Sequence, residues 1–429
     1  MERKIIRARL LSFLREPQSP QDTDSFRYIE DGGLLVEGGI IRAFDDFNRI
    51  DTTGAKVIDH RPHLVMPGFI DTHLHFPQTQ VIASWAAQLL DWLNDYTFPE
   101  ETRYSDPDFC AIMARKFLNL LGAHGTTTAV AYASVHATSA EALFAEAQTR
   151  NMRLITGKVM MDRNAPGGLL DTAQSSYDDT KALIARWHGK GRLGYAITPR
   201  FAITSTPAQM EAAQALAAEH PDCHIQTHLS ENHAEIALSC QLYPDAKDYT
   251  DIYARYGLLR ENSLLGHAIH LSDREIGALA EAGSKPVFCP TSNLYLGSGL
   301  FNDAKLRGKG LVNGIASDIG GGTSYSMLQT LAEGYKVLQL QGQRMHPYRA
   351  FHWITRGNAV ALGLEDLIGT LEAGSDADFV VLNARATPAM ALRMERARGL
   401  MDELFTLQVM GDDRAVVQTY LAGDACKGQ

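Results

Sequence analysis

The stretch Pro67-Gly68-Phe69-Ile70-Asp71-Thr72-His73-Leu74-His75 is an apolar run that ends in two histidines one residue apart. A short apolar run that follows a Pro-Gly pair predicts a buried β-strand. Side chains alternate faces along a strand, so His73 and His75 point to the same side and can bind one ion. Two ordinary strand-end histidines would have the same spacing, so the rest of the chain must decide whether this is a zinc site.

The composition is that of a globular protein. The chain has 429 residues, of which 45% are hydrophobic and 21% charged, enough for an α/β barrel with a side domain. A net charge of −10 without a basic stripe argues against nucleic acid as a partner. We expect no signal peptide, no membrane span and no membrane partner, because no apolar run is long enough. Five cysteines without a Cys-x-x-Cys pair indicate reduced thiols in the cytoplasm.

Both ends of the chain are rich in β-forming residues. Residues 1–64 alternate short β-like pieces with turns, and Gly38-Gly39 between two such pieces predicts a tight hairpin. A similar texture returns near the end of the chain. We therefore expect residues 1–64 and 366–429 to form one composite β-sandwich side domain, with residues 65–365 as an inserted catalytic domain.

The middle of the chain alternates apolar strand-like runs with helical patterns, which is typical of βα units around a parallel sheet. Eight such runs end near His73, Ala133, Met161, Phe201, Leu229, Ile269, Pro290 and Asp318. Eight strands close a barrel, so the predicted fold class is α/β, a (β/α)8 TIM-type barrel. The active site of such a barrel lies at the carboxyl ends of its strands, and polar residues there are the candidates for function.

Six polar residues fall at these predicted strand ends: His73, His75, Arg200, His228, His267 and Asp318. Each one alone has an ordinary explanation, such as a buried core histidine or an aspartate in a turn before glycines. Several imidazole nitrogens and a carboxylate at one barrel mouth together predict a metal site.

The first connection after the histidines is unusually long, from Phe76 to about Asp106. It carries apolar residues at helical spacing, namely Trp85, Leu89, Trp92, Leu93 and Tyr96. Such spacing usually means core packing. The segment also lies over the predicted mouth, so a lid that excludes water is an equal alternative.

These motifs together resemble the amidohydrolase superfamily of metal-dependent barrels, and the tail 357–382 is similar to the segment with which such enzymes return to their side domain. Four further stretches resemble the guanine deaminase family within it: His75-Phe76-Pro77-Gln78, Leu93-Asn94-Asp95-Tyr96-Thr97-Phe98-Pro99, Pro199-Arg200-Phe201 and residues 317–328. The resemblance implies a zinc-dependent aminohydrolase, a homodimer, that converts guanine to xanthine and ammonia with a metal-activated water.

The resemblance also implies roles for particular residues. The metal ligands would be His73, His75, His228 and Asp318, and the substrate would be bound by Gln78, Arg200, Phe201 and Trp92. Glu231, His267 and Asp318 would be catalytic. Binuclear relatives carry a modified lysine where this chain has Arg200, so one ion per chain is expected. Zinc is the expected ion, although imidazole and carboxylate also suit Fe²⁺ and Mn²⁺.

Two residues near the predicted site have a second interpretation. Glu231 follows His228 by three residues, which suits a proton carrier beside a metal-bound water, but a glutamate in the first turn of a helix would have the same position. Lys158, on the third predicted strand, is expected to be structural.

Three alternatives concern the whole protein. The pattern His-x-Glu at His233-Ala234-Glu235 matches half of a different zinc deaminase motif, but no Pro-Cys-x-x-Cys follows it, so we reject that fold. The same barrel could act on another aminopurine, a pyrimidine or a triazine. A non-catalytic scaffold is disfavoured, because every expected type of ligand is present.

Overall fold

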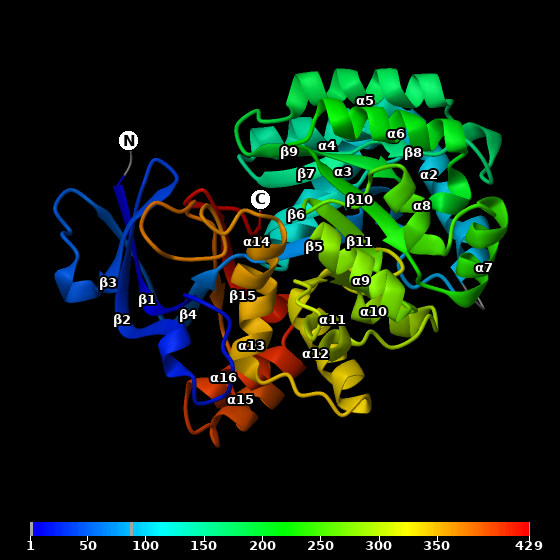
Figure 1. The fold of residues 1–429 in the computed structure, drawn as a ribbon. Coiled ribbons are helices and arrows are strands. Elements are labelled where there is room, and N and C mark those ends of the chain that lie inside the picture. Colours follow the sequence, from blue (N-terminus) through cyan, green and yellow to red (C-terminus); the bar gives the residue numbers. More distant parts are fainter. Residues whose placement is uncertain (1–2, 86–88, 429) are drawn as a thin grey trace.

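The structure is a computed structural model that describes residues 3–85 and 89–428. It has two parts, a barrel of parallel strands ringed by helices and a separate sheet that contains both ends of the chain (Figure 1). No helix of the described residues is long and apolar enough to cross a membrane.

Eight parallel strands form the barrel. In chain order they are β5 (Phe69–His75), β6 (Thr126–Tyr132), β7 (Arg153–Gly157), β9 (Leu193–Pro199), β10 (His224–Leu229), β11 (Ser263–His267), β12 (Lys285–Phe288) and β13 (Gly314–Ile315), with a short β8 (Val159–Met160) beside β9. Each strand ends within a few residues of its predicted position, so the predicted (β/α)8 fold is confirmed. Buried aliphatic residues on these strands, such as Ile70, Val130 and Leu264, form a core inside the barrel.

The first and last barrel strands are joined by a side chain rather than by a strand ladder. Asn358 Nδ2 donates to the carbonyl oxygens of Ile70 on β5 (2.7 Å) and Ile315 on β13 (2.8 Å), and its Oδ1 accepts from Ile315 N (3.0 Å). Just beyond these strands, Asp318 N donates to His73 O at 2.9 Å. The loop after β13 is thereby fixed against the histidine strand.

The helices surround the barrel and cover part of the terminal sheet (Figure 1). Their bounds are α1 (Leu89–Trp92), α2 (Phe98–Thr102), α3 (Pro107–Ala123), α4 (Ala137–Thr149), α5 (Ala173–Trp187), α6 (Pro207–Glu219), α7 (His233–Leu242), α8 (Tyr249–Arg255), α9 (Asp273–Ala282), α10 (Pro290–Tyr295), α11 (Asp303–Arg307), α12 (Met327–Leu340), α13 (Pro347–His352), α14 (Asn358–Ala361), α15 (Pro388–Met394) and α16 (Leu400–Met410).

Both chain ends meet in one seven-stranded sheet with the strand order β16-β15-β14-β4-β1-β2-β3. Its strands are β1 (Arg3–Phe13), β2 (Phe26–Glu37), β3 (Ile40–Asp46), β4 (Lys56–Pro67), β14 (Phe379–Leu382), β15 (Val416–Leu421) and β16 (Asp424–Ala425). The hairpin between β2 and β3 turns at Gly38 and Gly39 with φ of 62° and 80°, a backbone that favours glycine. The side domain made from both termini is thus present, whereas its exact boundaries at residues 64 and 366 stay a prediction.

The tail of the chain also holds two helices that the sequence analysis did not anticipate. α15 and α16 lie between β14 and β15, and α16 packs against α12 and α13. Leu404 and Leu407 of α16 are buried in the main core. The C-terminal segment is therefore mixed α and β: its strands join the terminal sheet, and its helix α16 packs on the outer helices of the barrel.

The long connection after β5 contains several short helical segments. α1, a π-helical turn (Leu93–Thr97) and α2 follow one another, and Leu89, Trp92 and Leu93 are buried while Trp85 is 78% exposed. Trp92 belongs to an apolar cluster with Tyr132 of β6 and Phe201, which follows β9, and it also lines a pocket at the mouth. The connection thus contributes both to core packing and to the wall of the pocket at the mouth.

Candidate active site

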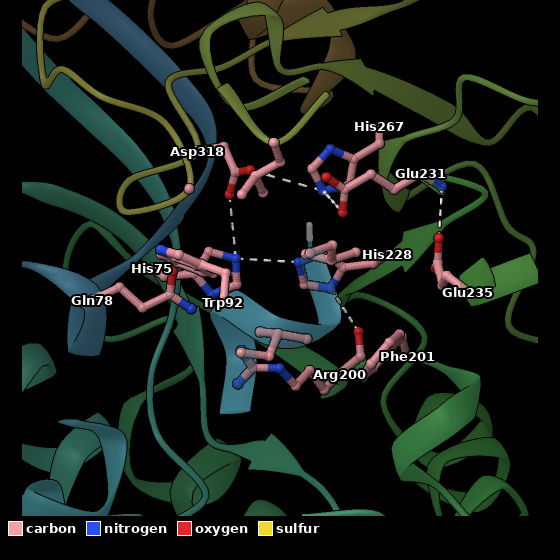
Figure 2. Close-up of a pocket in the computed structure, with 14 residues that line it drawn as sticks. His75, Gln78, Trp92, Arg200, Phe201, His228, Glu231, Glu235, His267 and Asp318 are labelled. Atoms are coloured by element: carbon pink, nitrogen blue, oxygen red, sulfur yellow. Dashed lines mark hydrogen bonds and ion pairs between the residues drawn. The ribbon is translucent and has the colours of Figure 1, made fainter. Parts of the chain in front are cut away.

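Four side chains converge at the carboxyl end of the barrel (Figure 2). His73 and His75 come from β5, His228 comes from β10, and Asp318 lies in the loop after β13. The Nε2 atoms of His75 and His228 are 3.2 Å apart. Asp318 Oδ1 lies 3.4 Å from the Nε2 atoms of both His73 and His75. The four residues named as ligands by the family resemblance therefore meet at one point.

The donor atoms of this cluster fit a metal ion. Both ring nitrogens of His73 are buried without a hydrogen-bond partner among the described residues. His228 Nδ1 lies 2.7 Å from the carbonyl oxygen of Arg200, which can only accept, so its Nε2 carries a lone pair toward His75. Nitrogens about 2.0–2.1 Å from a tetrahedral zinc would be roughly 3.3 Å apart, which matches the spacing here. The nitrogen atoms of this cluster therefore have the spacing and the lone pairs that metal binding requires.

The charge states of the cluster also suit a cation. Burial lowers the pKa of His75 and, together with the neighbouring histidines, holds the pKa of His228 well below its ordinary value. Burial opposes the ionisation of Asp318, but its close contacts with His73 and His75 hold its pKa well below the usual range. Neutral imidazoles beside an ionised carboxylate are the states in which these groups bind metal.

A second pair of side chains lies next to the cluster. His267 Nε2 is 3.3 Å from Glu231 Oε2 and 3.8 Å from Asp318 Oδ2. Asn293 Nδ2 lies 2.9 Å from His267 Nδ1, and Ser298 Oγ donates to Glu231 Oε1 at 2.8 Å. One oxygen of Glu231 is thereby engaged by the protein, while the other faces the histidine.

Burial, followed by the charges of Glu235 and Asp318, raises the pKa of Glu231 well above its ordinary value. A carboxyl group with a raised pKa is suited to carry protons near neutral pH. The alternative of a first-turn helix glutamate is wrong for Glu231, because α7 begins at His233 with Asn232 as its N-cap. Glu235 has that structural role and forms the capping box with Asn232.

The pocket beside this cluster contains all the residues proposed for substrate binding. It is lined by His75, Gln78, Leu89, Trp92, Leu93, Arg200, Phe201, His228, Glu231, Glu235, His267, Leu296, Asp318 and Gly321. Figure 2 shows Arg200 and Phe201 below the histidines and Gln78 and Trp92 at one side. The indole Nε1 of Trp92 is buried and has no partner in the described part of the chain.

Sequence reasoning missed two residues of this region, Glu101 and Tyr132. Glu101 Oε2 lies 2.7 Å from Arg200 Nη1, and Oε1 accepts from Gln78 Nε2 at 3.1 Å. The ring of Tyr132 packs against His73, His75 and His228 with centroid distances of 4.9, 4.5 and 4.9 Å. Tyr132 ends a predicted strand, a signal that could have found it. No motif distinguishes Glu101 from the neighbouring glutamate.

Lys158 is fully buried and does not line the pocket. Its Nζ lies 2.7 Å from Asp171 Oδ2 and donates to Val159 O at 3.2 Å. This ion pair, called the flank pair below, lies between the end of β7 and the start of α5 and outside the pocket, in keeping with the structural role expected for Lys158.

Comparisons with known proteins agree with this fold and site. Residues 64–426 match the model of the Amidohydrolase family. The chain therefore belongs to the amidohydrolase family of metal-site barrels.

Its similar relatives are guanine deaminases. The chain is 48% identical to the guanine deaminase of Escherichia coli (strain K12) over 98% of its own length and 97% of that protein. The structure of E. coli guanine deaminase superposes with a TM-score of 0.96 over 98% of this chain and 99% of that one. A guanine deaminase from C. acetobutylicum with bound guanine is 28% identical, with a TM-score of 0.90 over 99% of this chain and all of the other (100%). The family resemblance predicted from sequence is confirmed.

Proposed function

We propose that this protein is a guanine deaminase that hydrolyses guanine to xanthine and ammonia with one bound metal ion. The observation that carries the proposal is the meeting of the histidine–aspartate cluster with the arginine-lined pocket at one barrel mouth. The 48% identity to the E. coli enzyme over nearly the full chain supports the same activity. We further propose zinc as the ion, and a cytoplasmic homodimer, on the basis of that family.

His73, His75, His228 and Asp318 would hold the metal. When bound, a zinc ion with an open position lowers the pKa of its water to about 7 and so supplies a nucleophile at neutral pH. The net reaction forms a C2–O bond and breaks the bond from C2 to the exocyclic nitrogen. The chain must therefore orient the base and move protons to the ring and to the leaving ammonia.

Arg200 would orient the base. Guanine offers two adjacent acceptors, O6 and N7, on the edge remote from its C2 amino group, and a guanidinium matches such a pair with two parallel N–H groups. If Arg200 binds that edge, C2 faces His75 and His228 across the pocket (Figure 2). Phe201, Trp92 and Leu93 supply apolar walls for the ring and exclude water.

Glu231 would carry the protons on Oε2, the oxygen that faces His267. It takes a proton from the attacking water as the C2–O bond forms and gives it to the ring nitrogen next to C2. It then takes the remaining proton from the new C2 hydroxyl and gives it to the departing amino group, which leaves as ammonia. Ser298 holds the other oxygen, so the carboxyl group keeps one orientation through these transfers. His267 lies between Oε2 of Glu231 and Asp318, and both His267 and Asp318 can orient the attacking water by hydrogen bonding.

The proposal is tested by measuring ammonia release from guanine, adenine and cytosine with metal-loaded protein. Adenine presents a donor amino group beside N7, so an arginine fork would meet one donor with another. A mismatch of this kind in a buried site lowers kcat/KM by about 10⁴-fold. We expect guanine to be the fast substrate, and equal rates on adenine or cytosine would contradict the proposal.

A further inference from the structure

Glu101 is a charged side chain buried behind the base pocket rather than in it. It lies on α2, is 1% exposed, and is not among the residues that line the pocket. Its oxygens Oε1 and Oε2 accept from Arg200 Nη1 at 2.9 and 2.7 Å, and Oε1 also accepts from Gln78 Nε2 at 3.1 Å. One carboxylate therefore holds both of the polar side chains proposed to bind the base.

This contact decides which edge of Arg200 is left for a ligand. A guanidinium has two edges with paired donors, one formed by Nη1 and Nη2 and the other by Nε and Nη2. Glu101 occupies Nη1 with both of its oxygens, so the first edge is not available. No partner is found for Nε or Nη2 within residues 3–85 and 89–428. The ring of Phe98, also on α2, lies 5.5 Å from the guanidinium carbon and limits its rotation.

The same carboxylate fixes the amide of Gln78. Gln78 Nε2 donates to Glu101, and Gln78 Oε1 accepts from Gly320 N at 3.0 Å. A carboxylate only accepts and a backbone N–H only donates, so the amide has one orientation. One N–H of Gln78 remains free for the base.

We propose that Glu101 is a positioning residue that presents the Nε–Nη2 edge of Arg200 to the base and thereby sets the preference for a purine with acceptors at both O6 and N7. The inference rests on the proposed function. Without the carboxylate, the guanidinium turns about its last bonds and meets the base with one N–H instead of two. Glu101 also ties the connection after β5 to base recognition, because α2 belongs to that connection.

The test compares two substrates in two proteins. The substrates are guanine and 7-deazaguanine, which has a C–H group in place of N7, and the proteins are the wild type and Glu101→Gln. The glutamine has the same shape but offers one acceptor oxygen and no charge. We expect kcat/KM for guanine to fall on the order of 10²-fold, the scale of a lost charged hydrogen bond. For 7-deazaguanine the fall should be smaller by about 10-fold, because half of the paired contact is already absent.

Glu100→Gln is the matched control. Glu100 is the neighbouring residue on α2, but its carboxylate pairs with Arg103 at 2.8 Å and not with Arg200. This variant should keep the wild-type ratio of guanine to 7-deazaguanine. The double variant Glu101→Gln/Arg200→Lys should lose less kcat/KM for guanine than the two single losses multiplied together, since Glu101 acts mainly through Arg200.

The outcomes separate the two proposals. Equal losses of kcat/KM on both substrates, with normal metal content and melting temperature, would overturn the role of Glu101. Fully additive losses in the double variant would overturn it as well, even if Glu101→Gln alone is poorly folded. A wild type that releases no ammonia from guanine contradicts the proposed function itself, and this is seen before any variant is compared.

Discussion

Two buried ion pairs of the same barrel differ in how fully the protein uses their polar atoms. On the flank, Lys158 pairs with Asp171, whose carboxylate also accepts from Ser176 and from Gln209 Nε2, the latter at 2.7 Å. At the mouth, Arg200 pairs with Glu101 through Nη1 only. The flank pair is closed by its own surroundings, whereas the mouth pair keeps two donors for a ligand. Burial and charge alone therefore do not separate these two ion pairs; the unused donors of Arg200 do.

The largest expected effect concerns the cluster of histidines and aspartate at the mouth. His73→Ala, His75→Ala and His228→Ala should each lose bound metal and at least ~10³-fold in kcat, because the metal supplies several kcal/mol of transition-state stabilisation. Metal content by mass spectrometry and ammonia release are measured together. His220→Ala, at the far end of the barrel, is the control. Full metal content in all three variants would show that these three histidines are not metal ligands.

The second prediction tests whether Glu231 carries protons. Glu231→Gln keeps the shape and the contact with Ser298 but cannot carry protons. We expect kcat to fall at least ~10²-fold with metal content unchanged, the usual scale for loss of a general acid–base group. A metal-loaded variant with nearly normal kcat would show that Glu231 has a structural role, like Lys158 and Asp171, and does not carry protons.

The third prediction separates the charge of Arg200 from its paired hydrogen-bond donors. Arg200→Lys keeps the positive charge beside Glu101 but loses the fork of donors. We expect kcat/KM for guanine to fall at least ~10²-fold, while the melting temperature and the metal content stay close to those of the wild type. Guanine turnover that survives this change would mean that the unused donors of Arg200 do not bind the base.

The smallest expected effect on activity belongs to the flank pair. Lys158→Met removes the ammonium and leaves Asp171 buried without its counter-ion, which lowers the free energy of unfolding by about 3–5 kcal/mol. Because Lys158 does not line the pocket, kcat/KM per folded molecule should stay at the wild-type value. Urea unfolding and active-site-normalised kinetics give the two quantities. A loss of kcat/KM without a loss of stability would show that Lys158 serves catalysis and not the stability of the fold.

Much of the fold follows from local sequence. The period-two alternation at His73 and His75, and the eight apolar runs, predict the barrel and its metal cluster because parallel strands bring their carboxyl ends to one face. The last strand, β13, has only two residues, yet the apolar run that ends near Asp318 predicted its position. The helices α15 and α16 were missed because their apolar residues pack on the barrel helices and not in a domain of their own.

The residues that act on the site from behind could not be predicted. Glu100 and Glu101 are adjacent, both suit the first turn of a helix, and successive residues on a helix point about 100° apart. Which of the two faces Arg200 depends on how α2 follows the π-helical turn, a tertiary feature without a sequence signal. Lys158 and Arg200 likewise both follow barrel strands, and only the family resemblance separated their roles.

The topology of the terminal sheet determines when its strands can pair during synthesis of the chain. β4 ends at Pro67 and pairs with β14, which begins at Phe379, so most of the chain must be synthesised before β4 has its second neighbour. β5, with the two histidines, continues from β4 after Gly68, where a Cβ atom would lie 2.2 Å from Thr127 Oγ1. A large protein begins to fold as it emerges from the ribosome, and an open strand edge is prone to pair with other chains. The strand that leads directly into the catalytic barrel, β4, thus waits for nearly the last strands of the protein to protect its open edge.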